Sequence, residues 1–319
     1  MKRRKFLKNT AAVATTCSLF PGLVINSCTN KSLNNIGVQL FSLPKLLEKD
    51  FRGGIKMLSK MGYKEVELYG PFPFSVDSAK EDWKAVTPYL GFSGSGYFGH
   101  TPQEVKTILK ENDIKATSIH TDMKTLQTRM DQLGEAGDEL GFEYVGIPMI
   151  PEEKRKTLDD YKIVAEEFNK IGEQSKKVGL KFTYHNHGYG LQEMDGKIPL
   201  NIIIDQTDPS LVFFEMDIYW TMAGGADPIT YLEEYPGRYH LIHVKDMKEK
   251  VQFSGDGGNP DQWIELFPYM TNAGNGVLDL QSIISIGKKM GVKHFYVEQD
   301  MVDQPEIALK KSIDYLKTI

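Results

Sequence analysis

The chain has 319 residues, which exceeds a typical single-core domain and suits a barrel of repeated strand and helix units, commonly about 250 residues or more. Hydrophobic residues make up 40% and charged residues 25%, as in an ordinary globular protein. The formal charge of −5, with no basic run beyond the N-terminus, excludes an electrostatic footprint for nucleic acid and favours small or neutral partners.

The N-terminal segment, residues 1–33, resembles an export signal rather than part of a folded domain. It begins with basic residues, continues through a mildly apolar stretch of small residues, and contains "RRKFLK" from Arg3, which resembles a twin-arginine signal. Proline, glycine and asparagine interrupt the apolar stretch, which is too short for a stable transmembrane helix. We therefore expect residues 1–33 to direct export and residues 34–319 to form one domain. A disordered, basic tail is the alternative.

Both cysteines of the chain, Cys17 and Cys28, fall in this segment. The exported domain would therefore have no disulfide framework and no thiol nucleophile in its core. The sequence "VINSC" loosely resembles a lipoprotein cleavage box in which Cys28 is lipidated, although Asn26 fits that box poorly. We predict either a periplasmic protein or a membrane-anchored lipoprotein. The sequence makes no prediction of oligomeric state.

From residue 34 onward one pattern repeats: an amphipathic helical stretch, a glycine or asparagine, and a short β-rich run. The instances are "MLSKMGYKEVELYG", "ILKENDIKATSIHTD", "DELGFEYVGIPMI", "SKKVGLKFTYHNH", "EEYPGRYHLIHVKD" and "GKKMGVKHFYVEQD". The residue expected to end each helix in a left-handed conformation is Gly62, Asn112, Gly141, Gly179, Gly237 or Gly291. The pattern predicts alternating helices and parallel strands.

Two further strands, "NIGVQLFS" at 35–42 and "SLVFFEMDIYW" at 210–220, bring the predicted strands to eight. Eight strands alternating with helices predict a closed parallel (β/α)₈ TIM barrel, an α/β fold in a single domain. An open doubly wound sheet is the alternative. It is weakened because "QLFSLPK", and not a glycine-rich phosphate turn, follows the first strand.

Helix starts and loops can also be placed from the sequence. "TPQE" at 101–104 predicts a capping box with a proline in the first turn, and Asp227 followed by Pro228 predicts a second helix start. Residues 71–99 and 250–276 are rich in glycine, proline and aromatics and are predicted as long loops after strands. In a barrel, such loops surround the catalytic face.

Polar residues cluster at the ends of the last four strands of the predicted barrel. Alternate residues of a buried strand face the barrel interior. Counting along each strand therefore selects the inward-facing residue at its C-terminal end. Alternation also puts Glu215 and Asp300 on these inward faces and His240 on the opposite face. The residues chosen at similar height are His185, Asp217, His243 and Glu298.

Two imidazoles and two carboxylates at one point fit an open site for one divalent ion, Mn²⁺, Co²⁺, Zn²⁺ or Mg²⁺. A single histidine or aspartate at a strand end is more often a hydrogen-bonded structural residue. Four of them on neighbouring strands predict a metal centre. Water or substrate oxygens would fill the open positions.

The strand sequences also resemble a known superfamily. The phrases "GVQLFSL", "VELYG", "YHNHGYG", "FEMDIYW", "HVKDMK" and "FYVEQD" are similar to those of the sugar isomerase/epimerase superfamily of xylose isomerase-like barrels. This superfamily includes inosose dehydratases, keto-sugar 3-epimerases and the endonuclease IV barrel. The resemblance runs from Ile36 to Leu316 and implies that Asp217 and His243 are metal ligands and that Glu298 is a ligand or base.

One position departs from the epimerases of this superfamily. Where they carry a glutamate, in a phrase like "ENH", this chain has His185. The resemblance implies that those epimerases use two glutamates on opposite faces of the sugar, so the symmetric scheme would lose one member here. Inosose dehydratases share a "YHxH" phrase at this strand and eliminate water, which makes a lyase the competing hypothesis.

Further candidates lie around the predicted metal site. Glu67, inward at the end of its strand, is a candidate catalytic carboxylate, with a backbone-bonded rim residue as the alternative. Lys245 could neutralise an enolate, or could instead form an ion pair with Asp217 or Asp246. His187, the next inward residue after His185, is expected above the metal, toward the substrate.

The remaining candidates are predicted to bind substrate. His120, which shares the inward face of its strand with Asp122, could contact a substrate hydroxyl or move a proton. Gln39, Tyr219 and Trp220 suit hydrogen bonding to a sugar and stacking on it, with packing at the barrel rim as the alternative for the aromatic pair.

These residues support one chemical scheme. A metal that chelates a carbonyl and its neighbouring hydroxyl makes the α C–H bond acidic, and a carboxylate then removes the proton. We predict an exported, metal-dependent isomerase or epimerase acting on a keto-sugar. The alternatives are a lyase that eliminates water or an aglycone from an oxidised sugar, and a surface lipoprotein that binds sugar without turning it over. An endonuclease is disfavoured because it needs a larger ligand set and a basic face.

Overall fold

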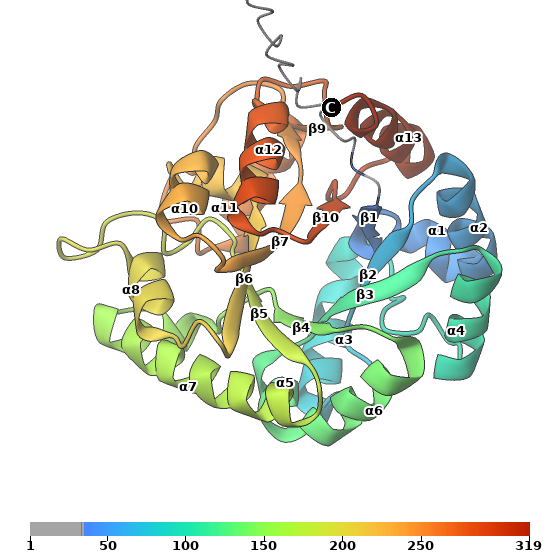
Figure 1. The fold of residues 1–319 in the computed structure, drawn as a ribbon, viewed down its shortest axis with the longest axis horizontal. Coiled ribbons are helices and arrows are strands. Elements are labelled where there is room, and N and C mark those ends of the chain that lie inside the picture. Colours follow the sequence, from blue (N-terminus) through green and yellow to red (C-terminus); the bar gives the residue numbers. More distant parts are fainter. Residues whose placement is uncertain (1–32, 34) are drawn as a thin grey trace, which may run out of the picture. The chain divides into compact units, whose positions relative to one another are not determined.

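The computed structural model describes residues 33 and 35–319. The predicted export motif, Cys17 and Cys28 lie outside these described residues, so those predictions stand as expectations. Eight parallel strands form a closed barrel in the order β1-β10-β7-β6-β5-β4-β3-β2, and helices surround it (Figure 1). The predicted TIM barrel in a single domain is confirmed.

The barrel strands are short and almost wholly buried, as expected for parallel strands covered by helices. Their bounds are β1 Ile36–Gln39, β2 Glu65–Tyr69, β3 Lys115–His120, β4 Tyr144–Ile147, β5 Lys181–His185, β6 Val212–Asp217, β7 Tyr239–Val244 and β10 His294–Val297. A separate antiparallel pair, β8 Asp246–Met247 and β9 Met270–Thr271, lies beyond the end of β7.

Most of the long helices bury an apolar face, as helices that pack on a barrel do. The bounds of the helices are α1 Pro44–Lys49, α2 Phe51–Met61, α3 Asp77–Leu90, α4 Pro102–Glu111, α5 Met123–Thr128, α6 Met130–Leu140, α7 Leu158–Lys177, α8 Pro199–Gln206, α9 Ile218–Ala223, α10 Pro228–Glu234, α11 Pro260–Leu266, α12 Leu280–Met290 and α13 Pro305–Leu316. Three short 3₁₀ helices join them: Leu40–Ser42, Glu152–Lys154 and Phe267–Tyr269. Within the described part of the chain, no helix combines the length and apolar character needed to cross a membrane.

Local signals placed most helix ends correctly. Thr101 and Glu104 form the predicted capping box at the start of α4, and Asp227 caps α10 by accepting a hydrogen bond from the Thr230 amide. All five glycines predicted to be left-handed have positive φ, from 77° to 107°. Asn112 was predicted wrongly: its φ is −107°, and the left-handed residue is the following Asp113, with φ 52°.

Two segments predicted as long loops contain regular structure. Residues 71–99 include the 14-residue helix α3, and residues 250–276 include α11 and β9. Helix α3 has no fully buried residue, so it lacks the apolar face on which a sequence-based prediction depends. Both segments follow barrel strands, which places them at the C-terminal end of the barrel.

A bulge in β7 changes the side that one histidine faces. Phe214 pairs with Tyr239 and Glu215 pairs with Leu241, so His240 is an extra residue between two pairs. Its ring stacks on Phe213 with centroids 3.9 Å apart. The prediction that His240 faces away from the interior is therefore wrong, because strict alternation does not hold across a bulge.

Candidate active site and metal centre

The C-terminal ends of six barrel strands bring titratable side chains to one place. These side chains belong to Glu67, His120, His185, Glu215, Asp217, His243, Lys245, Glu298 and Asp300, and each is at most 10% exposed. Parallel strands all end on the same face of the barrel, so residues far apart in the sequence converge there. Strand β4 contributes Gly146, where a Cβ atom would lie 2.8 Å from Cδ2 of His120, so its absence leaves room for that ring.

The outer part of this cluster holds the residues predicted as metal ligands. Donor atoms of Asp217, His243 and Glu298 lie within 4.8 Å of one another. Nδ1 of His243 is 2.8 Å from Oε2 of Glu298 and 3.9 Å from Oδ2 of Asp217. Nε2 of His185 is 3.8 Å from the same Asp217 oxygen. The structure thus brings all four predicted ligands together.

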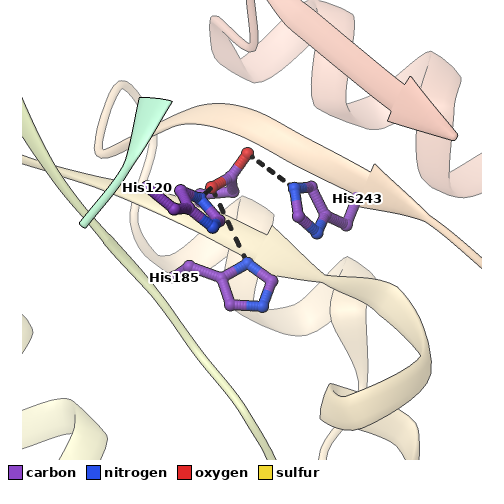
Figure 2. A group of neighbouring side chains, drawn as sticks. His120, His185 and His243 are labelled. Atoms are coloured by element: carbon purple, nitrogen blue, oxygen red, sulfur yellow. Dashed lines mark hydrogen bonds and ion pairs between the residues drawn. The ribbon is translucent and has the colours of Figure 1, made fainter. Parts of the chain in front are cut away.

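A second group lies on the other side of the same imidazole rings. Donor atoms of His120, His185, Glu215 and His243 also lie within 4.8 Å of one another. Figure 2 shows the three imidazoles turned toward one another, and the ring centroids of His185 and His243 are 4.4 Å apart. Oε2 of Glu215 is 2.6 Å from Nε2 of His120, and its Oε1 is 3.1 Å from Nε2 of His243.

Sequence reasoning missed Glu215 as a site residue. Alternation had placed it on the inward face two residues before Asp217, which was the available signal. It is fully buried, and its pKa is held well below the ordinary value: burial opposes ionisation, but the charges of His243 and His120 outweigh that effect.

The residues present fit a divalent cation. Nε2 of His185 faces Oδ2 of the candidate ligand Asp217 across 3.8 Å, which is too far for a hydrogen bond between them. Burial, together with the nearby charge of His243, lowers the pKa of His185 well below its ordinary value, which leaves a neutral imidazole suited to ligation. Two imidazoles and two carboxylates are a donor set typical of Zn²⁺, Mn²⁺ or Co²⁺. The candidate ligands are His185, Asp217, His243 and Glu298.

Lys245 is a fully buried cation among three carboxylates. Its Nζ lies 2.8 Å from Asp217, 2.6 Å from Glu298 and 2.7 Å from Asp300. Burial opposes protonation of Lys245, but these charges raise its pKa well above the ordinary value. Of the two ion pairs considered from the sequence, the one with Asp217 is therefore present. Asp246 instead accepts hydrogen bonds from backbone amides, including those of Gly274 and Gly276.

Glu298 and Asp300 differ in pKa although they share the same lysine. Burial opposes ionisation of Glu298, but the charges of Lys245 and His243 lower its pKa well below the ordinary value. Burial, followed by the charge of Glu298, raises the pKa of Asp300 to about 7. Oε2 of Glu298 contacts His243 and Lys245, whereas its Oε1 makes no hydrogen bond within the described residues.

Two residues predicted to act on the substrate, Glu67 and Gln39, form hydrogen bonds within the protein. Glu67 has 0% exposure, and its Oε2 accepts hydrogen bonds from Gln39 (2.7 Å) and from Nε2 of His243 (2.7 Å). Gln39 uses its other side-chain atom to accept from the Phe41 amide. Neither side chain reaches the surface of the site in this structure, and the catalytic role of Glu67 and the substrate contact of Gln39 stay predictions.

His120 also lies inside the cluster. Its Nε2 is 2.6 Å from Glu215 and 3.3 Å from Glu67. Burial opposes protonation of His120, but these two carboxylates raise its pKa. Its predicted contact with substrate is replaced by this internal pairing. Asp122, predicted on the same face, caps α5 instead by accepting a hydrogen bond from the Thr125 amide.

The aromatic residues predicted to hold a sugar are buried as well. Tyr219 is inaccessible, and its hydroxyl donates to the Leu266 carbonyl at 2.5 Å. Trp220 is 2% exposed and stacks on Phe253. Both belong to a small apolar core beside the barrel, which favours the alternative of packing at the rim, and their contact with substrate stays a prediction. The partly exposed ring at this rim is Trp263, which the sequence did not single out.

His187 lies beside His185, and its predicted place toward the substrate stays a prediction. The two ring centroids are 5.0 Å apart, and His187 stacks on Trp263 at 4.9 Å. Nδ1 of His187 lies 2.7 Å from the Pro148 carbonyl, which can only accept, so this nitrogen bears the proton and Nε2 presents a lone pair. Burial lowers the pKa of His187 to about 3, so the ring is neutral.

Comparison with known proteins agrees with the fold and with the resemblance noted from the sequence. A family model described as xylose isomerase-like TIM barrel matches residues 55–319. An inosose dehydratase of Clostridium tetani is 32% identical over 212 residues, which are 66% of this chain and 68% of that protein.

Among solved structures, a sugar phosphate isomerase/epimerase from Parabacteroides distasonis aligns with a TM-score of 0.67 and 23% identity over 92% of this chain and 97% of its own. The IolI protein, solved with a zinc atom, aligns with a TM-score of 0.62 and 14% identity over 89% and 95%. These two likenesses concern the fold alone. From the family match, the chain belongs to the xylose isomerase-like TIM barrel family.

Proposed function

We propose that this xylose isomerase-like barrel is a divalent-metal-dependent lyase that removes the proton α to the carbonyl of a keto-sugar and eliminates an oxygen substituent from the β carbon. His185, Asp217, His243 and Glu298 would hold the ion. When bound, the ion supplies Lewis acidity that stabilises the enolate oxygen. Inosose dehydratases among the relatives support a reaction of this type.

The observation on which elimination rests is the asymmetry of the rim. The carboxylates that are not wholly enclosed, Glu298 (7% exposed) and Asp300 (10%), both follow the same strand, β10. Strand β5 instead presents the imidazoles of His185 and His187. Because His187 donates its Nδ1 proton to the Pro148 carbonyl, its Nε2 has no proton to return to the second face of a substrate.

Elimination needs only one acid–base group, and Glu298 supplies it. Its free Oε1 takes the α proton, and the C–H electron pair forms the new carbon–carbon double bond. The β C–O bond breaks as that double bond forms, and the departing oxygen receives the proton from Glu298. The products are an unsaturated ketone and water or an alcohol, so no oxidant or reductant is required.

Lys245 and His187 serve this step without exchanging atoms with the substrate. The ammonium of Lys245 holds Oε2 of Glu298 at 2.6 Å and so aims Oε1. Nε2 of His187 can accept a hydrogen bond from a substrate hydroxyl, and Trp263 stacked beside it provides a flat apolar surface typical of sugar sites.

Interconversion of ketoses is the second candidate, because the predicted metal set specifies proton removal and not the fate of the enolate. The two are separated by incubating purified protein and Mn²⁺ with 3-keto-glycosides and free ketoses in heavy water. Elimination yields an ultraviolet-absorbing enone and a released alcohol. Recovery of deuterated ketose isomers without any enone would reject the lyase. Sugar binding with no turnover would support a binding protein instead.

We also propose that the protein is exported, either as a periplasmic protein or as the lipid-anchored form predicted from Cys28. The support is the sequence "RRKFLK" in the segment outside the described residues. Full-length protein should appear in the periplasmic or membrane fraction of a host with a twin-arginine pathway. Replacing Arg3 and Arg4 by lysine should retain it in the cytoplasm, whereas an unchanged distribution would refute twin-arginine export. Cys28→Ser separates anchoring from export.

A further inference from the structure

We propose that Glu215 is a positioning residue that fixes two metal ligands, His185 and His243, in the ring orientation and tautomer that binding of the ion requires. The inference rests on the metal site of the proposed function and assigns a role to a buried carboxylate that the reaction does not use. Glu215 has 0% exposure, so it cannot contact substrate itself.

The two nitrogens of His243 face different groups. Nδ1 faces the outer carboxylates, 2.8 Å from Glu298 and 3.9 Å from Asp217. Nε2 faces the inner carboxylates, 2.7 Å from Glu67 and 3.1 Å from Glu215. Carboxylates accept hydrogen bonds from both nitrogens, in line with the raised pKa of His243; once the Nδ1 proton is lost, the inner pair keeps the remaining proton on Nε2. The lone pair is then available at Nδ1, on the side of the candidate ligands.

In His185 the two ring nitrogens have the opposite roles to those in His243. Nε2 is the nitrogen near the outer carboxylate Asp217, at 3.8 Å, and Nδ1 lies 3.7 Å from Oε2 of Glu215. That second separation exceeds a hydrogen bond, and Nδ1 has no other partner in the described chain. The negative charge of Glu215 favours a proton on Nδ1, which leaves the Nε2 lone pair toward Asp217.

Glu215 is the carboxylate shared by both ligands and is itself held in place. His120 anchors it through a 2.6 Å contact, and its two oxygens also lie 3.7 Å from Nδ1 of His185 and 3.1 Å from Nε2 of His243. Glu67 offers a matched comparison: it is also 0% exposed, and it contacts His243 and His120 but has no contact with His185. Removing the carboxylate charge at residue 215 should therefore disturb two ligands, and removing it at residue 67 should disturb one.

Metal binding by the full folded domain tests this role directly. The affinity for Zn²⁺ and Mn²⁺ is measured by competition with a chelator for wild type, Glu215→Gln, Glu67→Gln and Glu215→Asp. We expect Glu215→Gln to weaken binding by about 10 to 100-fold, the size usual for loss of a group that orients a ligand. Glu67→Gln should weaken it less, and Glu215→Asp, which keeps a charged carboxylate, should recover part of the loss.

Imidazole nitrogen resonances give a readout that a merely structural role would not move. In the wild type loaded with Zn²⁺, the protons should lie on Nε2 of His243 and on Nδ1 of His185. If Glu215→Gln does not fold, Glu215→Asp is measured in its place, and it should keep this pattern. The opposite tautomers in the wild type would overturn the proposal. So would unchanged affinity in Glu215→Gln, or binding of two ions per chain, since the inner group would then be a metal site itself.

The same measurements separate this inference from the proposed function. Wild-type protein that binds one ion with the expected tautomers, but does not turn over any keto-sugar, would refute the enzyme and leave the positioning role standing. Wild-type protein that binds no divalent ion would refute both.

Discussion

The two ends of the barrel contain the same kinds of titratable side chains in opposite surroundings. At the N-terminal end each histidine has one partner: His294 Nδ1 lies 2.7 Å from Glu65, and His240 Nδ1 lies 3.1 Å from the Tyr144 hydroxyl. At the C-terminal end, His243 faces carboxylates with both nitrogens. Contacts between aromatic rings fill the N-terminal end, whereas charged side chains fill the C-terminal end.

The difference teaches where the protein tolerates unbalanced charge. Five carboxyl groups meet at the C-terminal end, against one lysine and two histidines, His120 and His243, whose pKa values the carboxylates raise despite burial. Buried charge of one sign is unfavourable unless a cation balances it. The surplus favours a divalent ion at this end, and the described residues of the N-terminal end show no comparable surplus.

The strongest way to break this comparison is to remove one histidine from each end. His243→Ala should reduce turnover of the keto-sugar by at least about 10²-fold, the size of losing one preorganised electrostatic stabiliser. His240→Phe, at the other end, keeps a ring against Phe213 and should leave turnover unchanged. Steady-state rates of both folded variants with added Mn²⁺ provide the measurement. Full activity in His243→Ala would remove the basis for a catalytic metal.

The barrel and its four candidate ligands could be predicted because both follow from periodicity within single segments. The repeat of helix, glycine and strand gives the fold, and alternation along each strand selects His185, Asp217, His243 and Glu298. Neither step needs a distance between strands.

What could not be predicted depends on contacts between strands or on a change of period. Glu67 and Gln39 were taken for site residues because nothing in either strand shows that they bond to each other. Tyr219 and Trp220 were counted as strand residues, but α9 begins at Ile218. Their side chains therefore follow the spacing of a helix, and both are buried in the core. His240 was misplaced because the β7 bulge is not encoded by alternation.

Lys245→Met should produce the largest loss of stability. The change leaves Asp217, Glu298 and Asp300 without their shared cation, and breaking a buried pair in this way costs about 3 to 5 kcal/mol. Denaturant unfolding in the presence of a chelator measures the loss. Adding Mn²⁺ should restore part of it, because the ion replaces the missing positive charge. A variant as stable as the wild type in chelator would show that the carboxylates are not ionised together.

A smaller, pH-dependent effect is expected at the N-terminal end. Burial, aided by the charges of Lys293 and Lys181, lowers the pKa of His240 from 6.5 to about 4. Between these values the unfolded chain binds a proton that the folded protein does not, so stability is complete above pH 6.5 and falls as the pH is lowered toward 4. The loss should reach at most about 3 kcal/mol.

His240→Phe should remove this contribution, because phenylalanine does not titrate. The difference in unfolding free energy between wild type and variant, measured at several pH values from 7 to 4.5, isolates His240 from the other acidic groups. Parallel curves for the two proteins would mean that His240 is already protonated in the fold, contrary to its pairing with Tyr144 and Phe213.

The smallest effect is expected for a lysine at the outer edge of the N-terminal end. Lys181 forms an ion pair with Glu143 at 2.6 Å, but its side chain is 37% exposed and that of Glu143 is 65% exposed. Water screens such a pair, so Lys181→Met should cost about 0.2 to 1 kcal/mol, and added salt should reduce the difference further. Chemical denaturation at low and high ionic strength measures both quantities. A loss approaching that of Lys245→Met would mean that charge, and not ring packing, also maintains this end of the barrel, and the contrast between the two ends would fail.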